Sequence, residues 1–258
     1  MTKVTHTITR RPKKTNRTIK TCCLILLAGL FVCVVVFFWS QKIPQELDPN
    51  RIALIAVVGN NYIFRGNNPF VTKDKETVFA YHELTSYFNN ILSQQDRNLL
   101  QDYYLVDVSL LDLDEYYTMK KEEQFFAKHP DRGRVMNIST LSPSLLFKRS
   151  PHSNRVTQQI TERYSLWVTN TLKQIQEMAS RQTDKPIIIY IHCNAGRDRT
   201  GFIVAGYKLL FHNVHLSGVR LQNVAESGRN SEGVYEQAIY SYCLHVKQVY
   251  NKSNDYCD

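Results

Sequence analysis

A cysteine and an arginine stand six positions apart in the segment HCNAGRDRTG, residues 192–201, and these two side chains could do chemistry together. The five residues between Cys193 and Arg199 are enough to wrap once around a tetrahedral oxyanion, with successive backbone N–H groups pointing inward. A planar guanidinium can then bind two of the oxygens through a bidentate fork. The spacing therefore predicts a phosphate pocket beside a thiol.

The segments on either side of this loop must position it. Residues 187–191, after Pro186, form a continuous run of β-branched and aromatic side chains, which predicts a buried strand. Residues 202–214 indicate an apolar helix whose N-terminus faces the loop. Such a field stabilises a thiolate relative to the thiol, so we expect Cys193 to be a nucleophile. The alternative is that Cys193 is a small apolar residue buried in a turn between strand and helix.

The fixed positions of the loop match the pattern H-C-x-x-G-x-x-R-T-G, which resembles the signature of the cysteine-dependent protein tyrosine and dual-specificity phosphatase superfamily. The resemblance implies a cysteinyl-phosphate intermediate that water then hydrolyses, without a metal or a cofactor. It also implies that His192 orients the loop and that the Thr200 hydroxyl stabilises the thiolate. The residues expected to bind phosphate are Asn194, Ala195, Gly196, Arg197, Asp198 and Arg199.

In this superfamily an aspartate on a separate mobile loop commonly donates the proton to the leaving oxygen. Our first candidate is Asp198, because the end of the loop resembles that of phosphoinositide-active and some bacterial tyrosine phosphatases. The second is Asp131 in the segment HPDRG, although it lies 62 residues before Cys193, farther than is usual for the family. Asp112 and Asp114 follow a predicted strand and stay open as alternatives. Each of the four carboxylates could instead be structural or solvated.

A second cation in the loop bears on the substrate. Arg197 favours a substrate with more than one phosphate, such as a phosphoinositide, whereas the low net charge of the remaining domain argues against strong attraction to anionic membrane surfaces. We expect a hydrolase that acts on phosphotyrosine or mixed phosphoprotein substrates. A phosphatase for phosphoinositides or inositol phosphates is the first alternative, and an inactive phosphate-binding adaptor is the second.

The positive charge of the chain is concentrated at its N-terminus. The sequence has 32 Lys and Arg against 23 Asp and Glu, and residues 1–42 hold eight of these cations and no acidic residue. The remainder is close to neutral, so the basic pI comes from the N-terminal tail. It therefore gives no reason to expect a nucleic-acid partner.

A stretch of nineteen residues without a charge, 21–39, follows this tail and ends in Trp39. At about 1.5 Å per residue it is long enough to cross the hydrocarbon core of a bilayer, so it predicts a single transmembrane helix. A buried core helix and a cleaved signal peptide are the alternatives. The predicted layout is a basic tail (1–20), an anchor (21–39), a linker (40–50) and a phosphatase domain (51–258).

The side of the membrane on which the domain lies is left open. The positive-inside rule places the tail in the cytoplasm and the domain across the bilayer, whereas a thiolate nucleophile works best in a reducing compartment. A disulfide between Cys243 and Cys257 is possible but not required. Oligomeric state is not predicted.

Hydrophobic patterns give the fold class. Strands are predicted at 51–58 and 103–111, helices at 75–90 and 155–180, and two helical segments with a break at Gly228 and Gly233 in 216–249. A charged, turn-rich insertion is expected at 112–134, and a new helix start at 93. This order predicts an α/β domain with a central, mostly parallel sheet flanked by helices.

One further segment carries a weaker signal. The segment NYIFRGNNPF is similar to the start of compact atypical dual-specificity phosphatases, with an arginine and a glycine at Arg65 and Gly66. By itself it would be an ordinary strand that ends in a turn.

Overall fold

The computed structural model describes residues 45–138 and 155–258. The predicted tail and anchor, residues 1–20 and 21–39, lie outside the described residues. Within the two described ranges, no helix has the length and apolar character needed to span a bilayer.

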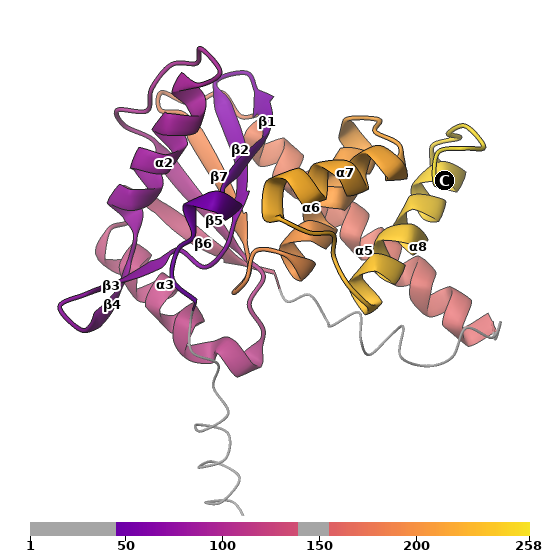
Figure 1. Cartoon of the computed structure of the whole chain (residues 1–258), viewed down its shortest axis with the longest axis horizontal. Helices are drawn as coiled ribbons and strands as arrows, with labels where there is room; N and C mark the ends of the chain where they lie inside the picture. Colours follow the sequence, from indigo (N-terminus) through magenta and orange to yellow (C-terminus); the bar gives the residue numbers. More distant parts are fainter. Residues whose placement is uncertain (1–44, 139–154) are drawn as a thin grey trace, which may run out of the picture. The chain divides into compact units, whose positions relative to one another are not determined.

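The central sheet has five strands in the order β1-β2-β7-β5-β6 (Figure 1). β1 is antiparallel to β2, and the other neighbours are parallel, which confirms the predicted mostly parallel sheet. The carboxyl ends of the four parallel strands therefore meet at one edge of the sheet. The strands span Ala53–Val58 (β1), Asn61–Gly66 (β2), Tyr104–Ser109 (β5), Gly133–Asn137 (β6) and Ile187–His192 (β7).

Alternation along the central strand β7 divides the apolar core in two. Ile189 and Ile191 belong to one core cluster, with residues of α5, α6 and α8. Ile188 and Tyr190 belong to the other, with residues of α2 and α3. Successive side chains of a strand point to opposite faces, so helices cover both faces of the sheet (Figure 1). The helices are α2 (Tyr81–Ser93), α3 (Tyr116–Lys128), α5 (Arg155–Ala179), α6 (Asp198–Phe211), α7 (Leu216–Ser227) and α8 (Val234–Val249).

Helix α6 follows the loop and is apolar on nearly all sides. Ten consecutive residues from Thr200 to Leu209 are buried. Such a helix must be surrounded by protein, and α5, α7 and α8 all contact it. Its N-terminus is therefore held firmly at the end of β7.

The region expected to be a turn-rich insertion, 112–134, is instead ordered secondary structure. It contains the 3₁₀ helix η2 (Leu113–Glu115), α3 and the start of β6. The buried positions of α3 recur at helical spacing but include Thr118 and Glu122 beside Phe126, so the apolar period that reveals a helix is absent.

The helix predicted from residue 75 begins at Tyr81, because residues 70–79 form a hairpin of β3 (Phe70–Lys73) and β4 (Glu76–Phe79). Its turn holds Asp74 and Lys75 at positive φ. The helix start predicted at residue 93 is wrong, since α2 ends at Ser93.

The C-terminal region matches the predicted break between two helices. Gly228 ends α7 at a φ of 81°, and Gly233 precedes α8 at a φ of 56°. Beyond α8, Cys257 forms a disulfide with Cys243, so the bridge left open by the sequence is present. The carbonyl of buried Tyr256 accepts a hydrogen bond from Leu216 N–H, which ties the C-terminus to the start of α7.

Candidate active site

Cys193 lies at the junction of β7 and the loop that leads into α6. Its side chain is 2% exposed, and it is the free cysteine among the described residues. α6 begins at Asp198, so the N–H groups of its first turn have no intrahelical partner. These N–H groups and the helix dipole create a field that favours an anion beside Cys193.

Gly196 allows the loop to turn closely against the end of β2. Its φ is 66°, and a Cβ at this position would lie 2.5 Å from the carbonyl oxygen of Gly66 and 2.7 Å from the amide nitrogen of Asn67. Both obstacles are backbone atoms, which cannot move aside as a side chain could. A side chain at position 196 is therefore incompatible with this loop.

The buried Arg65 braces the same turn. Its Nη2 donates to the carbonyl of Gly196 at 2.9 Å, and its Nη1 donates to Asn223 and Glu226 of α7, each at 2.9 Å. Burial lowers the pKa of Arg65, and the charge of Glu226 opposes that effect. The arginine of the weak motif NYIFRGNNPF thus supports the loop structurally. Its partner Glu226 lies in no motif that the sequence reveals.

Arg199 is oriented by a carboxylate that the sequence analysis did not identify. Its Nη1 and Nη2 donate to the two oxygens of Glu115 at 2.5 and 2.8 Å. Nη1 also contacts the Leu110 carbonyl at 2.8 Å and Asp112 at 3.3 Å. Burial lowers the pKa of Arg199, but the hydrogen bond to Glu115 and the nearby anionic groups, Cys193 among them, raise it overall. The guanidinium therefore stays charged and fixed in direction.

His192 is fully buried and faces two carboxylates. Its Nε2 lies 2.9 Å from Asp107 Oδ1, on β5, and 3.5 Å from Glu122 Oε1, on α3. Burial lowers the pKa of His192, but the charges of Asp107 and Glu122 outweigh it, so the pKa is raised. Burial raises the pKa of Glu122 to about 8. Asp107 and Glu122 were not predicted as site residues, because Asp107 lies within a buried strand and Glu122 within the segment expected to be an insertion.

The remaining loop residues contact the segment before β1. Asn194 Oδ1 accepts a hydrogen bond from Gln45 N–H at 2.9 Å, and the Ala195 carbonyl accepts one from Arg51 at 2.8 Å. Arg51 ends the 3₁₀ helix η1 (Pro49–Arg51). This segment therefore supports the loop from outside.

Four side-chain polar atoms of residues 192–201 are buried without a hydrogen-bond partner among the described residues. Two are the ring nitrogens of His192, and the other two are Thr200 Oγ1 and Arg197 Nε. The latter two lie at the N-terminus of α6, where an anion would be bound. They are donors that a phosphate or a thiolate could accept from.

Asp198 is engaged in structural contacts. Arg229 donates to both of its oxygens at 3.0 Å, and Glu232 N–H donates to Oδ1 at 3.1 Å. These bonds attach the connection between α7 and α8 to the start of α6. Both carboxylate oxygens of Asp198, the first acid candidate, are therefore engaged in these contacts.

The sheet topology argues against the predicted acid role of Asp131. Asp131 precedes β6, which is parallel to β5, and β5 is parallel to β7. It therefore lies at the amino end of the strands, whereas Cys193 follows their carboxyl end. The five residues of β6 separate the two edges by about 17 Å. Asp112 and Asp114 follow β5 and lie at the same edge as Cys193.

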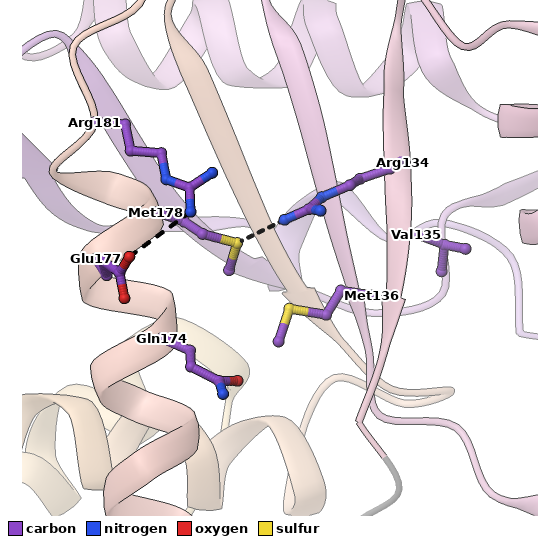
Figure 2. Close-up of a pocket in the computed structure, with 7 residues that line it drawn as sticks. All are labelled: Arg134, Val135, Met136, Gln174, Glu177, Met178 and Arg181. Atoms are coloured by element: carbon purple, nitrogen blue, oxygen red, sulfur yellow. Dashed lines mark hydrogen bonds and ion pairs between the residues drawn. The ribbon is translucent and has the colours of Figure 1, made fainter.

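A pocket between β6 and α5 is distinct from the loop (Figure 2). Arg134 donates to the sulfur of Met178 across it at 3.1 Å, and Arg181 pairs with Glu177 at 3.8 Å. It begins where β6 starts and α5 ends, at the strand edge opposite Cys193. It therefore takes no part in the chemistry of the loop.

The chain is similar to known proteins over part of its length. Residues 81–220, more than half of the chain, match the profile of the Tyrosine phosphatase family. No curated protein matches. Solved structures with which the chain aligns include PTPMT1 in complex with PI(5)P (13% identity, TM-score 0.37, 76% of this chain and 97% of that chain). Others are P. aeruginosa TpbA (15%, 0.37, 77% and 96%) and the Siw14 catalytic core (16%, 0.37, 82% and 95%).

The matched range contains Cys193, Arg199 and Glu115, together with β5, β6, β7, α3, α5 and α6, whereas β2 with Arg65 precedes it. The chain thus belongs to the tyrosine phosphatase family, and it is a phosphatase, a hydrolase of phosphoric monoesters.

Proposed function

We propose that this protein is a protein tyrosine phosphatase that uses Cys193 as its nucleophile. The thiolate attacks phosphorus, the bond to the substrate oxygen breaks, and water then hydrolyses the cysteinyl-phosphate. The charge on the equatorial oxygens is stabilised by Arg199 and by the loop N–H groups. Pairing with Glu115 holds the guanidinium ready before substrate binds.

The observation that supports phosphotyrosine is a group of exposed apolar and aromatic side chains next to Glu115 in the chain, the residue that orients Arg199. Leu113, Tyr116 and Tyr117 flank Glu115 in the chain and are 76%, 40% and 49% exposed. Exposed rings and a leucine can pack against the phenyl ring of a phosphotyrosine, whose phosphate the loop then binds. Phosphoserine offers no ring for this contact.

The charges around the loop disfavour a substrate with several phosphates. Arg229 is neutralised by Asp198, and the carboxylates of Asp112 and Glu115 pair with Arg199, with Asp114 close to both of them. A phosphoinositide phosphatase stays as the second candidate, because the partnerless Nε of Arg197 could bind a second phosphate.

We assign the general acid to Asp112. Its carboxylate lies 3.3 Å from the guanidinium of Arg199, at the strand edge that carries Cys193. Glu115 is committed to a bidentate pair, and Asp198 to Arg229. Asp112 also caps η2 together with Glu115, and it follows β5 at the strand edge where the leaving oxygen must lie, so we assign it the proton transfer to that oxygen.

We also propose that residues 21–39 anchor the protein as a single-pass membrane protein, with the layout expected from the sequence. The disulfide between Cys243 and Cys257 supports an oxidising compartment for the domain. This is the side that the positive-inside rule predicts for it.

The test of the function is a substrate panel for the full chain in detergent with EDTA. Phosphotyrosine, phosphoserine and phosphothreonine peptides are compared with soluble short-chain phosphoinositides. We expect the highest kcat/KM on phosphotyrosine peptides and no turnover by Cys193→Ser. A higher kcat/KM on phosphoinositides would favour the second candidate, and no turnover of any substrate would point to a binding protein.

A further inference from the structure

Behind the nucleophile, the described residues bury a group of three ionisable side chains that the reaction does not touch: Asp107, Glu122 and His192. All three are completely inaccessible to solvent. They come from three different elements, β5, α3 and β7. Their ligating atoms lie within 4.8 Å of one another. An ionic group of this kind is costly to bury unless its charges cancel.

Alternation along the strands explains why these groups meet. Tyr190 faces the α2 and α3 side of β7, so His192, two residues later, faces the same side. On β5, Leu105 faces that side, and so does Asp107. Cys193 belongs to the opposite core, with α5, α6 and α8. The peptide between His192 and Cys193 thus joins a buried charge to a nucleophile.

The protonation of the group follows from charge balance. With both carboxylates ionised and a neutral imidazole, the cluster would carry two uncompensated negative charges without water. With a proton on Glu122 and two on His192, it carries one negative and one positive charge, 2.9 Å apart. Burial raises the pKa of Glu122 to about 8, and the nearby charge of Asp107 raises the pKa of His192.

We propose that Asp107 and Glu122 are positioning residues that hold His192 as an imidazolium, and that this buried cation stabilises the Cys193 thiolate. This rests on the proposed role of Cys193 as the nucleophile. Asp107 supplies the negative charge, and Glu122 acts as a neutral, proton-bearing partner at neutral pH. The imidazolium adds a positive charge behind the thiolate. Like the N-terminus of α6, it stabilises the thiolate relative to the thiol.

The other charged and titratable groups around His192 are accounted for. Arg199 faces it from α6 and lowers the pKa of His192. Glu115 raises the pKa of Glu122, and the Ser109 hydroxyl on β5 lowers it. Tyr190 stacks on the imidazole with ring centroids 5.5 Å apart, and burial raises its pKa, so it stays neutral. Asp107 is the largest of the influences that raise the pKa of His192.

The experiment measures the alkylation of Cys193 by iodoacetamide as a function of pH in the full chain, without substrate. In Asp107→Asn we expect the midpoint of the pH dependence to rise by about one pH unit. Alkylation at pH values below the midpoint should then be about tenfold slower than in wild type. Glu122→Gln is the matched control, because an amide is as neutral as the protonated acid. It should keep the wild-type midpoint.

A second measurement needs no substitution near the cluster. In wild-type protein labelled with ¹⁵N-histidine, the signal that disappears in His192→Gln should show both ring nitrogens protonated at neutral pH. A neutral imidazole would overturn the proposal, and so would an unchanged midpoint in Asp107→Asn. A midpoint that moves equally in both variants, and in wild-type protein with a chelator, would show a bound metal ion instead and also overturn it.

These outcomes are separable from those of the substrate panel. A failure of the phosphotyrosine assignment leaves the alkylation midpoints as expected, because alkylation uses no phosphorylated substrate. An unchanged midpoint in Asp107→Asn, with normal turnover, would overturn the proposed role of the buried cluster alone.

Discussion

At the scale of single residues, the site is defined by three ion pairs between an arginine and a carboxylate. Glu115 pairs with Arg199, Asp198 pairs with Arg229, and Glu226 pairs with Arg65. A carboxylate that binds an arginine through both oxygens is held in one direction, which suits positioning and opposes proton transfer. Asp112 touches Arg199 through one oxygen at 3.3 Å. We therefore expect the acid role and the structural roles to separate cleanly in variants.

Asp112→Asn should slow hydrolysis according to the leaving group. A poor leaving group such as phenol needs a proton, so kcat on phenyl phosphate should fall by about 10²- to 10⁴-fold. A good leaving group such as 4-nitrophenol needs none, so its rate should stay close to that of wild type. Steady-state kinetics on both esters gives the ratio of the two kcat values. Asp114→Asn is the control and is expected to leave this ratio unchanged.

Asp198→Asn should behave differently. It loses an ion pair that is partly exposed, so we expect a loss of stability of at most about 1 kcal/mol in chemical denaturation. Its rate should change by the same factor on both esters. A fall confined to phenyl phosphate would return the acid role to Asp198 and remove it from Asp112.

At the scale of elements, the close approach of the loop to β2 is the tightest constraint on the site. Arg65 bonds to the carbonyl of Gly196, and Gly196 leaves no room for a Cβ beside Gly66 and Asn67. The loop thus depends on a strand more than one hundred residues earlier in the chain. This dependence can be tested by adding one methyl group.

Gly196→Ala should displace the loop and reduce kcat/KM strongly, with a loss of stability of about 1 to 3 kcal/mol from the positive φ and the contact with backbone. Gly59→Ala is the matched control, because Gly59 has a φ of 59° but nothing within 4 Å of its Cβ. It should show the conformational cost without the loss of activity. Equal activity in the two variants would contradict the close approach.

Some elements could be predicted from the sequence and others could not. The loop, β7, α5 and the break between α7 and α8 follow from local patterns, and they are present as expected. The η2 and α3 region was not predicted, because Glu122 is buried by pairing with His192, a partner seventy residues away. Glu115 was missed for the same reason. A polar residue buried by a distant partner resembles a surface residue until the fold brings the two together.

At the scale of the molecule, the disulfide closes the C-terminal end of the fold. Cys243 and Cys257 are 14 positions apart, and the segment between them brings Tyr256 under α6 and α7. A loop of this length contributes about 3 kcal/mol in the chain-entropy model. The bridge lies in a different part of the domain from the loop, so stability and catalysis should respond separately to reduction.

Cys243→Ser should lower Tm by about 6 to 12 °C while leaving kcat at 25 °C close to wild type. Dithiothreitol should lower the Tm of the wild-type chain similarly and have no further effect on the variant. Cys193→Ser is the control, since it keeps the bridge and should keep its sensitivity to dithiothreitol. A Tm that dithiothreitol does not change would show that the bridge is absent in solution.

The division of the core by β7 has a consequence for how such an enzyme can diverge. The side chain of His192 faces one layer of helices and that of Cys193 faces the other, although the two residues are adjacent in the chain. Changes in α3 can adjust the reactivity of the thiol without altering any surface that meets a substrate. Changes in the exposed residues after β5 can alter recognition without disturbing the thiol. Selection can therefore act on substrate choice and on intrinsic reactivity as two separate traits.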